Sequence, residues 1–176
     1  GYDKDDIRYK SQSGELIVSR NGNQIVMDFP LWPFKKEEGY EERLEEAFGA
    51  KPIEVYSGYD WVAVFESKEF IASLSPNMSK IAEIKEARGF IATAKDGDQY
   101  DFVSRAFFPA IGIDEDPVTG SAHCILAPLW EQKLNKTTMK ARQVSDRGGD
   151  LDLEIKNDRL FISGEAKLYL KGTIYV

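Results

Sequence analysis

Residues 116–121 bring together groups that could bind a small anion and move a proton. Asp116 is a carboxylate, which can act as general acid or base, or orient a substrate amine, when it is partly removed from water. Thr119 and Ser121 add hydroxyl donors, and Gly120 lets a ligand approach the backbone closely. A helix that begins near Gly120 exposes unpaired amides at its positive end, which stabilise a carboxylate or a developing oxyanion. The pattern therefore predicts an anion pocket with a carboxylate beside it.

The same residues also fit a purely structural role. Asp116 or Thr119 can cap the helix while Gly120 eases a turn, and local physics leaves both interpretations open. His123 and Cys124 follow directly, but neighbouring residues of a helix point to different faces, so we interpret both as core packing. One histidine and one cysteine supply too few ligands of the right type, and we expect no metal site.

A glycine-containing segment at residues 145–150 offers a further polar group. Its glycines fit a turn between two strands, and Arg147 could clamp a carboxylate with two parallel hydrogen bonds. The turn alone is the simpler interpretation, and contact between Arg147 and a ligand stays open.

The motif lies in a stretch that other structure must enclose. Residues 114–134 predict a helix of about 15 residues that is apolar on every face in its middle, whereas a surface helix keeps a polar side. Strands precede and follow it, so the economical fold is a strongly curved sheet wrapped around one central helix, without a second helical layer. Pro128 should kink or end this helix, because proline removes a hydrogen bond and clashes with the preceding turn.

The flanking segments alternate strand patterns with turn signals. Asn21-Gly22 predicts a tight hairpin, and Gly49 predicts the left-handed end of a short surface helix. Short helices are expected at residues 40–48, 68–74 and 78–84. Strands are expected at residues 13–20, 24–29, 53–56, 61–65, 89–94, 100–108, 138–144, 151–155, 160–163 and 167–176. The predicted fold class is α+β, with a mostly antiparallel, barrel-like sheet.

Composition narrows the class of protein. With 176 residues, the chain is long enough to form one domain with its own core. The net charge of −7 repels nucleic acid phosphates, so no nucleic acid partner is expected. The single cysteine favours a reducing compartment, and the polar N-terminus lacks a signal peptide, so we expect a cytoplasmic protein. The longest apolar run, residues 122–130, is too short to span a membrane.

At residues 115–123, Glu-Asp-Pro-Val-Thr-Gly-Ser-Ala-His, the chain resembles the signature of the PhzF-like (phenazine biosynthesis) family, which is related in fold to diaminopimelate epimerase. The resemblance covers nearly the whole chain. It extends to residues 13–16, 27–30, 104–109, 128–130 and 145–149.

This resemblance implies an isomerase that transfers a proton on a small carboxylate-bearing substrate without cofactor or metal. Members of the family have two lobes, each a curved sheet around a central helix, with the active site in the cleft between them. Carried over by the motif, Asp116 and Ser121 are expected to be catalytic, and Gly120 and Thr119 to bind substrate. A homodimer is also expected, because family members are often dimers.

The resemblance also implies that part of the enzyme is missing from this chain. No counterpart of the family's N-terminal lobe is found, including its acid/base glutamate, and the chain opens on Gly1 without an initiator methionine. We expect residues 1–29 to be a hairpin remnant of that lobe, and residues 30–176 to be a C-terminal lobe that is inactive alone. The alternative is a non-catalytic lobe that binds an anion or another protein.

Overall fold

The computed structural model describes residues 6–11 and 14–174, which are mainly β-structure. The helices are α1 (Glu41–Phe48), α2 (Lys68–Ser73), α3 (Met78–Glu83), α4 (His123–Leu134) and one 3-10 turn, η1 (Pro109–Ile111). The strands are β1 (Asp6–Ser11), β2 (Gly14–Asn21), β3 (Gln24–Pro30), β4 (Lys35–Glu37), β5 (Glu54–Ser57), β6 (Trp61–Val64), β7 (Phe90–Lys95), β8 (Phe102–Phe108), β9 (Ile113–Asp116), β10 (Thr138–Gln143), β11 (Gly149–Lys156) and β12 (Arg159–Glu165).

All twelve strands belong to one mixed sheet. Their order is β1-β2-β3-β12-β11-β10-β8-β7-β6-β5-β4, and β9 pairs with β8 outside this path. The pairs β6–β7 and β8–β10 are parallel, whereas β7–β8 and β10–β11, for example, are antiparallel. The α+β class and the mostly antiparallel pairing are thus confirmed.

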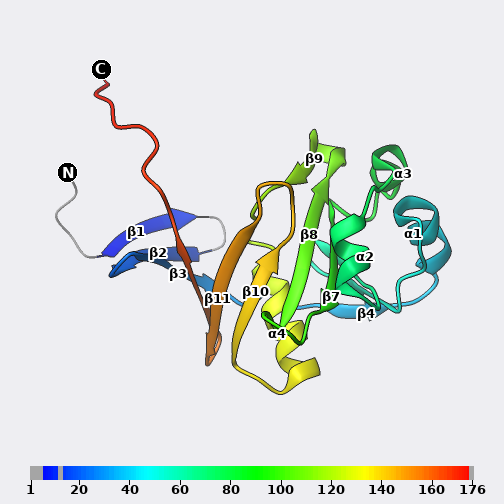
Figure 1. Cartoon of the computed structure of the whole chain (residues 1–176), viewed down its shortest axis with the longest axis horizontal. Coiled ribbons are helices and arrows are strands. Elements are labelled where there is room, and N and C mark those ends of the chain that lie inside the picture. The colour runs from blue at the N-terminus through cyan, green and yellow to red at the C-terminus, as the bar shows by residue number, and fades with distance from the viewer. Residues whose placement is uncertain (1–5, 12–13, 175–176) are drawn as a thin grey trace.

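The sheet is open, so the predicted barrel is wrong. Strands β1 and β4 stand at the two ends of the strand order, and in the described residues they do not pair with each other. Figure 1 shows β1 and β4 at opposite sides of the molecule. Regular spacing of short strands is common to barrels and open sheets, so the sequence pattern alone did not distinguish them. Curvature of the sheet around α4 stays a prediction.

Helices pack against both faces of the sheet. On one face, Ile125 and Leu126 of α4 are buried against Phe102 and other inward residues of the neighbouring strands. On the other face, Leu44 of α1 and Ile71 of α2 are fully buried in a second apolar cluster. Figure 1 shows α4 passing behind β8 and β10, with α1, α2 and α3 gathered near β7. The expectation that no second helical layer is needed is therefore wrong, because strands β5–β8 have apolar residues on both faces of the sheet, and both faces must be covered.

Helix α4 starts at His123 and continues through Pro128 to Leu134. Pro128 has no N–H to donate to the carbonyl of Cys124, one turn earlier. The backbone N–H of Trp32 donates to that carbonyl instead, at 2.9 Å. This bond satisfies the freed acceptor, so the helix does not end at the proline.

Most of the short elements are confirmed. Strands β2 and β3 form the hairpin expected at Asn21-Gly22, and Gly22 has a φ of 61°. Gly49 ends α1 with a φ of 82°, and its N–H donates to the Glu45 carbonyl at 2.8 Å. The three short helices lie where the patterns predicted them.

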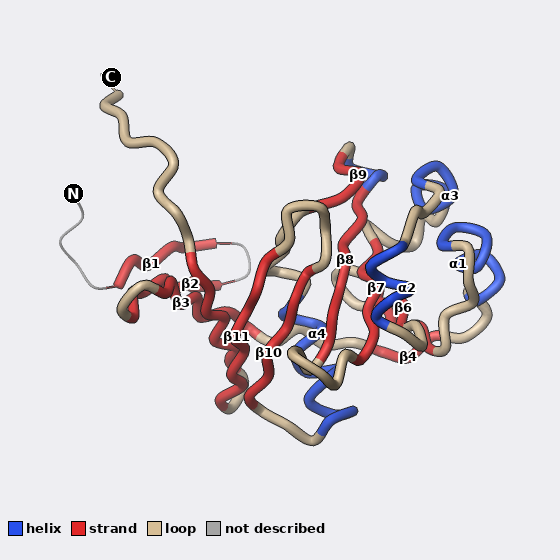
Figure 2. The backbone as a smooth tube through the Cα atoms, in the orientation of Figure 1, coloured by secondary structure: helices blue, strands red, loops and turns tan. Residues whose placement is uncertain are grey.

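The largest errors concern strands that were missed and one predicted strand that is absent from the described residues. Strand β1 was not expected, because residues 6–11 are mostly polar; its pairing with β2 supplies the order that its sequence pattern lacks. Strands β4 and β9 were also missed. Residues 166–174 form no strand, although Leu168 and Tyr169 belong to a segment with a strand-type pattern. The side chains of these two residues are 83% and 100% exposed. Figure 2 shows this segment as a loop that runs away from the sheet, and residues 175–176 lie outside the described residues.

The proposed boundary near residue 30 falls inside the sheet. Strand β3 pairs with β12 over residues 24–30 and 159–165, so the first hairpin and the rest of the chain share hydrogen bonds. Division into a remnant and a lobe stays a prediction.

Candidate functional site

Strand β9 positions Asp116 at the start of the candidate loop, residues 116–121. Asp116 is the last residue of β9, and it pairs with Ala106 of β8. The preceding Glu115 accepts two hydrogen bonds of 2.7 Å from the Arg105 guanidinium, which also donates to the Leu74 carbonyl at 2.6 Å. The side chains of Arg105 and Glu115 are only 11% and 21% exposed. A largely buried ion pair therefore anchors the strand end that carries Asp116.

Every polar atom of Thr119 is bonded inside the protein. Its N–H donates to Gln143 Oε1 at 2.8 Å, and its carbonyl lies 2.9 Å from His123 Nδ1. Its hydroxyl donates to Asp116 Oδ2 at 2.7 Å and accepts from Gln143 Nε2 at 3.2 Å. Thr119 is 5% exposed. Its burial favours support of Asp116 over the direct substrate contact that we predicted.

Gln143 holds the same loop from β10 and was missed by the sequence analysis. Its side chain is fully buried, and Nε2 also donates to the Asp116 carbonyl at 2.6 Å. A signal was available: Met139, Ala141 and Gln143 alternate on the inward face of the strand, so a polar residue stands where an apolar one is expected. A buried polar group normally requires partners, and this one finds them in the candidate site.

Only one oxygen of the Asp116 carboxylate accepts a hydrogen bond from the described residues. Oδ2 accepts from Thr119, whereas Oδ1 has no hydrogen-bond partner among the described residues. Asp116 is half-buried, so this free oxygen lies in a partly desolvated position.

Residues 120–122 make a turn before α4 and do not yet belong to the helix. The N–H of His123 donates to the Gly120 carbonyl at 3.1 Å, and the N–H of Cys124 donates to the Ser121 carbonyl at 3.1 Å. The N–H groups of Gly120 and Ser121 themselves find no acceptor in the part of the chain that the structure describes. The helix starts later than predicted, but the unpaired amides that an anion would need are present.

The loop between β10 and β11 also contacts the segment that follows Asp116. The Ser145 hydroxyl donates to the Pro117 carbonyl at 2.7 Å and accepts from the Gly148 N–H at 3.1 Å. Gly148 has a φ of 67°, which favours glycine. The turn interpretation of residues 145–150 thus holds, and it supports the loop that follows Asp116.

His123 and Cys124 are both buried in the core, as predicted. Burial lowers the pKa of His123 to about 4, and the hydrogen bond to the Thr119 carbonyl opposes this only in part. The imidazole is therefore neutral near pH 7, with Nδ1 donating to Thr119. Burial also raises the pKa of Cys124 to about 12, so its thiol is a poor nucleophile. His123 adds a support of the loop that we did not predict.

Two hollows lie on either side of the loop. Ser121 and Cys124 line one of about 230 Å³, together with Trp32, Tyr59 and Arg88. Arg88 there is bound to the buried Asp60 by hydrogen bonds of 2.8 and 2.7 Å, so its charge is already neutralised.

Val118 lines the other hollow, of about 580 Å³, which also contains Arg147. Arg147 has no hydrogen-bond partner among the described residues, and whether it contacts a carboxylate ligand stays open. The loop thus contributes Ser121 to one hollow and Val118 to the other.

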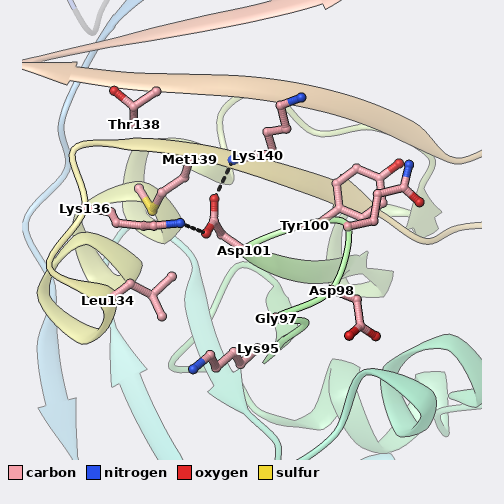
Figure 3. Close-up of a pocket in the computed structure, with 11 residues that line it drawn as sticks. Lys95, Gly97, Asp98, Tyr100, Asp101, Leu134, Lys136, Thr138, Met139 and Lys140 are labelled. Carbon is pink, nitrogen blue, oxygen red and sulfur yellow. Dashed lines mark hydrogen bonds and ion pairs between the residues drawn. The ribbon is translucent and has the colours of Figure 1, made fainter.

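A further hollow, of about 650 Å³, lies elsewhere, where β8 and β10 begin (Figure 3). Its carboxylates are already neutralised. Asp101 accepts from Lys136 Nζ and from the Lys140 N–H, and Asp98 pairs with Lys68. None of the predicted site residues lines it.

Within 6–11 and 14–174, no three side chains of His, Cys, Asp or Glu gather as a metal site would require. No helix in the same ranges is both long and apolar enough to cross a membrane.

Comparison with known proteins identifies relatives along nearly the whole chain. The family model described as phenazine biosynthesis-like protein (PhzC-PhzF) matches residues 4–172. The chain is 41% identical to the uncharacterized isomerase BH0283 of Halalkalibacterium halodurans over 96% of its own length, and 43% identical to the uncharacterized isomerase PA3578 of Pseudomonas aeruginosa over the same share. It spans 64% of the length of each of these curated relatives.

Solved structures give the same result. A PhzF family phenazine biosynthesis protein from Enterococcus faecalis matches with a TM-score of 0.91 and 40% identity, covering 100% of this chain and 67% of that one. A putative PhzC/PhzF protein from Clostridium difficile matches with a TM-score of 0.84 and 38% identity, covering 98% and 66%. With a family model over residues 4–172, relatives above 40% identity and the same fold, the chain belongs to the PhzC-PhzF phenazine biosynthesis-like family.

Proposed function

We propose that this chain belongs to an isomerase that moves a proton on a small substrate bearing a carboxylate. One observation carries the proposal: a rigidly held loop leaves Asp116 Oδ1 and the N–H groups of Gly120 and Ser121 without partners in the described residues. The names of its relatives, two of them called isomerases, support the reaction class.

The free groups suit the two needs of such a reaction. Asp116 exchanges the proton, or orients a substrate amine beside the reacting carbon. When a C–H bond next to a carboxylate breaks, the electron pair moves onto the carboxylate oxygens, and the Gly120 and Ser121 amides stabilise this charge. The same proton, or one from solvent, then bonds to the other face or to another carbon, which completes the isomerisation.

Several parts of the proposal rest on the family resemblance alone. We keep as predictions that a glutamate outside residues 1–176 supplies the main acid or base and that no cofactor is required. The cytoplasmic location, expected from the single cysteine and the polar N-terminus, also stays a prediction. The expectation that these 176 residues are inactive alone has no support from the comparisons.

The test is proton exchange from deuterated water into a panel of small amino and hydroxy acids. The complete encoded protein and the 176-residue chain are assayed together, with Asp116→Asn and Ser121→Ala variants. We expect exchange to fall by at least ~100-fold in Asp116→Asn, the range assigned to general acid–base catalysis, and by less in Ser121→Ala. Exchange that is unchanged in both variants would exclude this site assignment.

A binding or interaction role is the second candidate. It is favoured by the C-terminal segment, where Leu168, Leu170 and Ile174 are 83%, 78% and 86% exposed. Exposed apolar residues in a row favour contact with another chain, and a homodimer is one such contact. Analytical ultracentrifugation separates the candidates: a strictly monomeric protein that exchanges deuterium supports the enzyme alone.

A further inference from the structure

Gln143 stands out among the buried polar side chains that support the site. Its three hydrogen bonds all reach the segment 116–119, and its side chain has no exposure to solvent. It belongs to a row of polar residues on three neighbouring strands, because Ser104 of β8 pairs with Thr93 of β7 and with Gln143 of β10. Thr93 uses its hydroxyl for Trp130 and for the Val103 carbonyl, far along α4 from the loop.

The partners of Gln143 fix the orientation of its amide. Oε1 accepts from the Thr119 N–H at 2.8 Å, so the NH₂ group must face the two oxygens on the other side. It donates to the Asp116 carbonyl at 2.6 Å and to the Thr119 hydroxyl at 3.2 Å. Rotating the amide by half a turn would set oxygen against oxygen and N–H against N–H.

This orientation also decides where the Thr119 proton points. A hydroxyl has one proton to donate, and here its oxygen already accepts from Gln143 Nε2. The proton is therefore directed to Asp116 Oδ2, 2.7 Å away. One carboxylate oxygen is held in this way, and Oδ1 is turned out as the oxygen available to a substrate.

We propose that Gln143 is a positioning residue that sets the place and rotation of the Asp116 carboxylate through Thr119. The inference rests on the proposed function for its catalytic meaning, but not for its structural content. Gln143 holds the backbone of Asp116 by donating a hydrogen bond to the Asp116 carbonyl. It holds the side chain of Asp116 indirectly, through the Thr119 hydroxyl. The backbone and the carboxylate of Asp116 therefore both depend on one amide.

The experiment compares Gln143→Leu with Thr93→Val in the complete protein. Both substitutions remove hydrogen bonds of a fully buried side chain in the same row, but only Gln143 touches the loop. We expect kcat for deuterium exchange to fall about 100-fold in Gln143→Leu, as small misplacement of a catalytic group does, with KM changed less than about threefold. Thr93→Val should change kcat less than about threefold. Equal losses in the two variants would overturn the proposal.

A double-mutant cycle with Thr119→Val tests the route through Thr119. Because Gln143 acts on the carboxylate through this hydroxyl, the fall in kcat of the double variant should be well below the product of the two single effects. A product of independent effects would show that Gln143 does not act through Thr119. If Gln143→Leu does not fold, Gln143→Asn keeps the amide but shortens the side chain, and the same cycle applies.

Hydrogen exchange of the Thr119 amide tests the inference without any substrate. In Gln143→Leu its protection should fall at least tenfold more than in Thr93→Val, because its acceptor is Gln143 Oε1. If the wild-type protein exchanges deuterium with no candidate acid, the proposed function fails, and this amide alone decides the role of Gln143. Equal protection in both variants would refute it.

Discussion

The two ends of strand β10 hold polar groups in opposite ways. Where β10 ends at Gln143, the polar groups are mostly neutral, buried and bonded to one another around Thr119 and His123. Where β10 begins, they are charged and mostly exposed, and Figure 3 shows Lys136 and Asp101 paired at the wall of the hollow of about 650 Å³.

Under the proposed site assignment, the size of a hollow is not what marks the site. The two aspartates that line the hollow of about 650 Å³ are already paired with lysines, whereas the loop that lines the hollow of about 230 Å³ through Ser121 has unpaired amides and a free carboxylate oxygen. Buried hydrogen bonds give fixed positions, since few alternative partners exist in the interior. Exposed ion pairs leave long side chains free to move and contribute little to order.

The largest expected effect comes from breaking the ion pair behind the site. In Arg105→Leu, Glu115 and the Leu74 carbonyl lose their partner in a largely buried position. We expect the free energy of unfolding to fall by about 3–5 kcal/mol, the usual cost of leaving one buried charge unpaired. Urea denaturation measures it. A loss below about 1 kcal/mol would mean that this end of the sheet is no more dependent on its buried groups than the other.

An intermediate effect is expected from pH through His123. Its pKa of about 4 lies below the usual 6.5, so as pH falls from 6.5 to 4 the unfolded chain binds a proton that the native protein does not. Stability should therefore be lost across this window, by about 3 kcal/mol from this group. Urea denaturation at pH 7 and pH 4.5 should show a smaller loss in His123→Leu than in the wild type. Because the chain has one histidine, an identical loss would exclude this source.

The elements that sequence predicts well are those whose signals are local. The hairpin at Asn21-Gly22 and the helix end at Gly49 need particular backbone angles that few residues adopt, and both lie where expected. The loop at residues 116–121 was also predicted from a local signal, because its candidate residues are contiguous in the sequence. Pro128 misled because its local rule holds, but Trp32, almost a hundred residues earlier, supplies the missing donor.

The parts that sequence could not predict depend on distant partners. Strand β1 exists through its pairing with β2, whereas residues 166–174 pair with no strand in the part of the chain that the structure describes, despite a better strand pattern. Gln143 could be predicted to face inward by its alternation with Met139 and Ala141. Its bonds to Thr119 could not, because they join β10 to a loop 24 residues earlier in the chain.

The smallest effect should come from the other end of strand β10, where it begins. The Lys136 and Asp101 side chains are 54% and 18% exposed, and Asp101 keeps its bond from the Lys140 N–H when Lys136 is changed. Lys136→Met should therefore lower the free energy of unfolding by only about 0–1 kcal/mol, since solvent screens the pair and holding the lysine in place costs entropy. Urea denaturation beside Arg105→Leu gives the direct comparison of one pair at each end. Deuterium exchange by Lys136→Met should equal that of the wild type, because no site residue lines this hollow. A loss of exchange there would place part of the chemistry at the end that we exclude, and the contrast between the two ends would no longer hold.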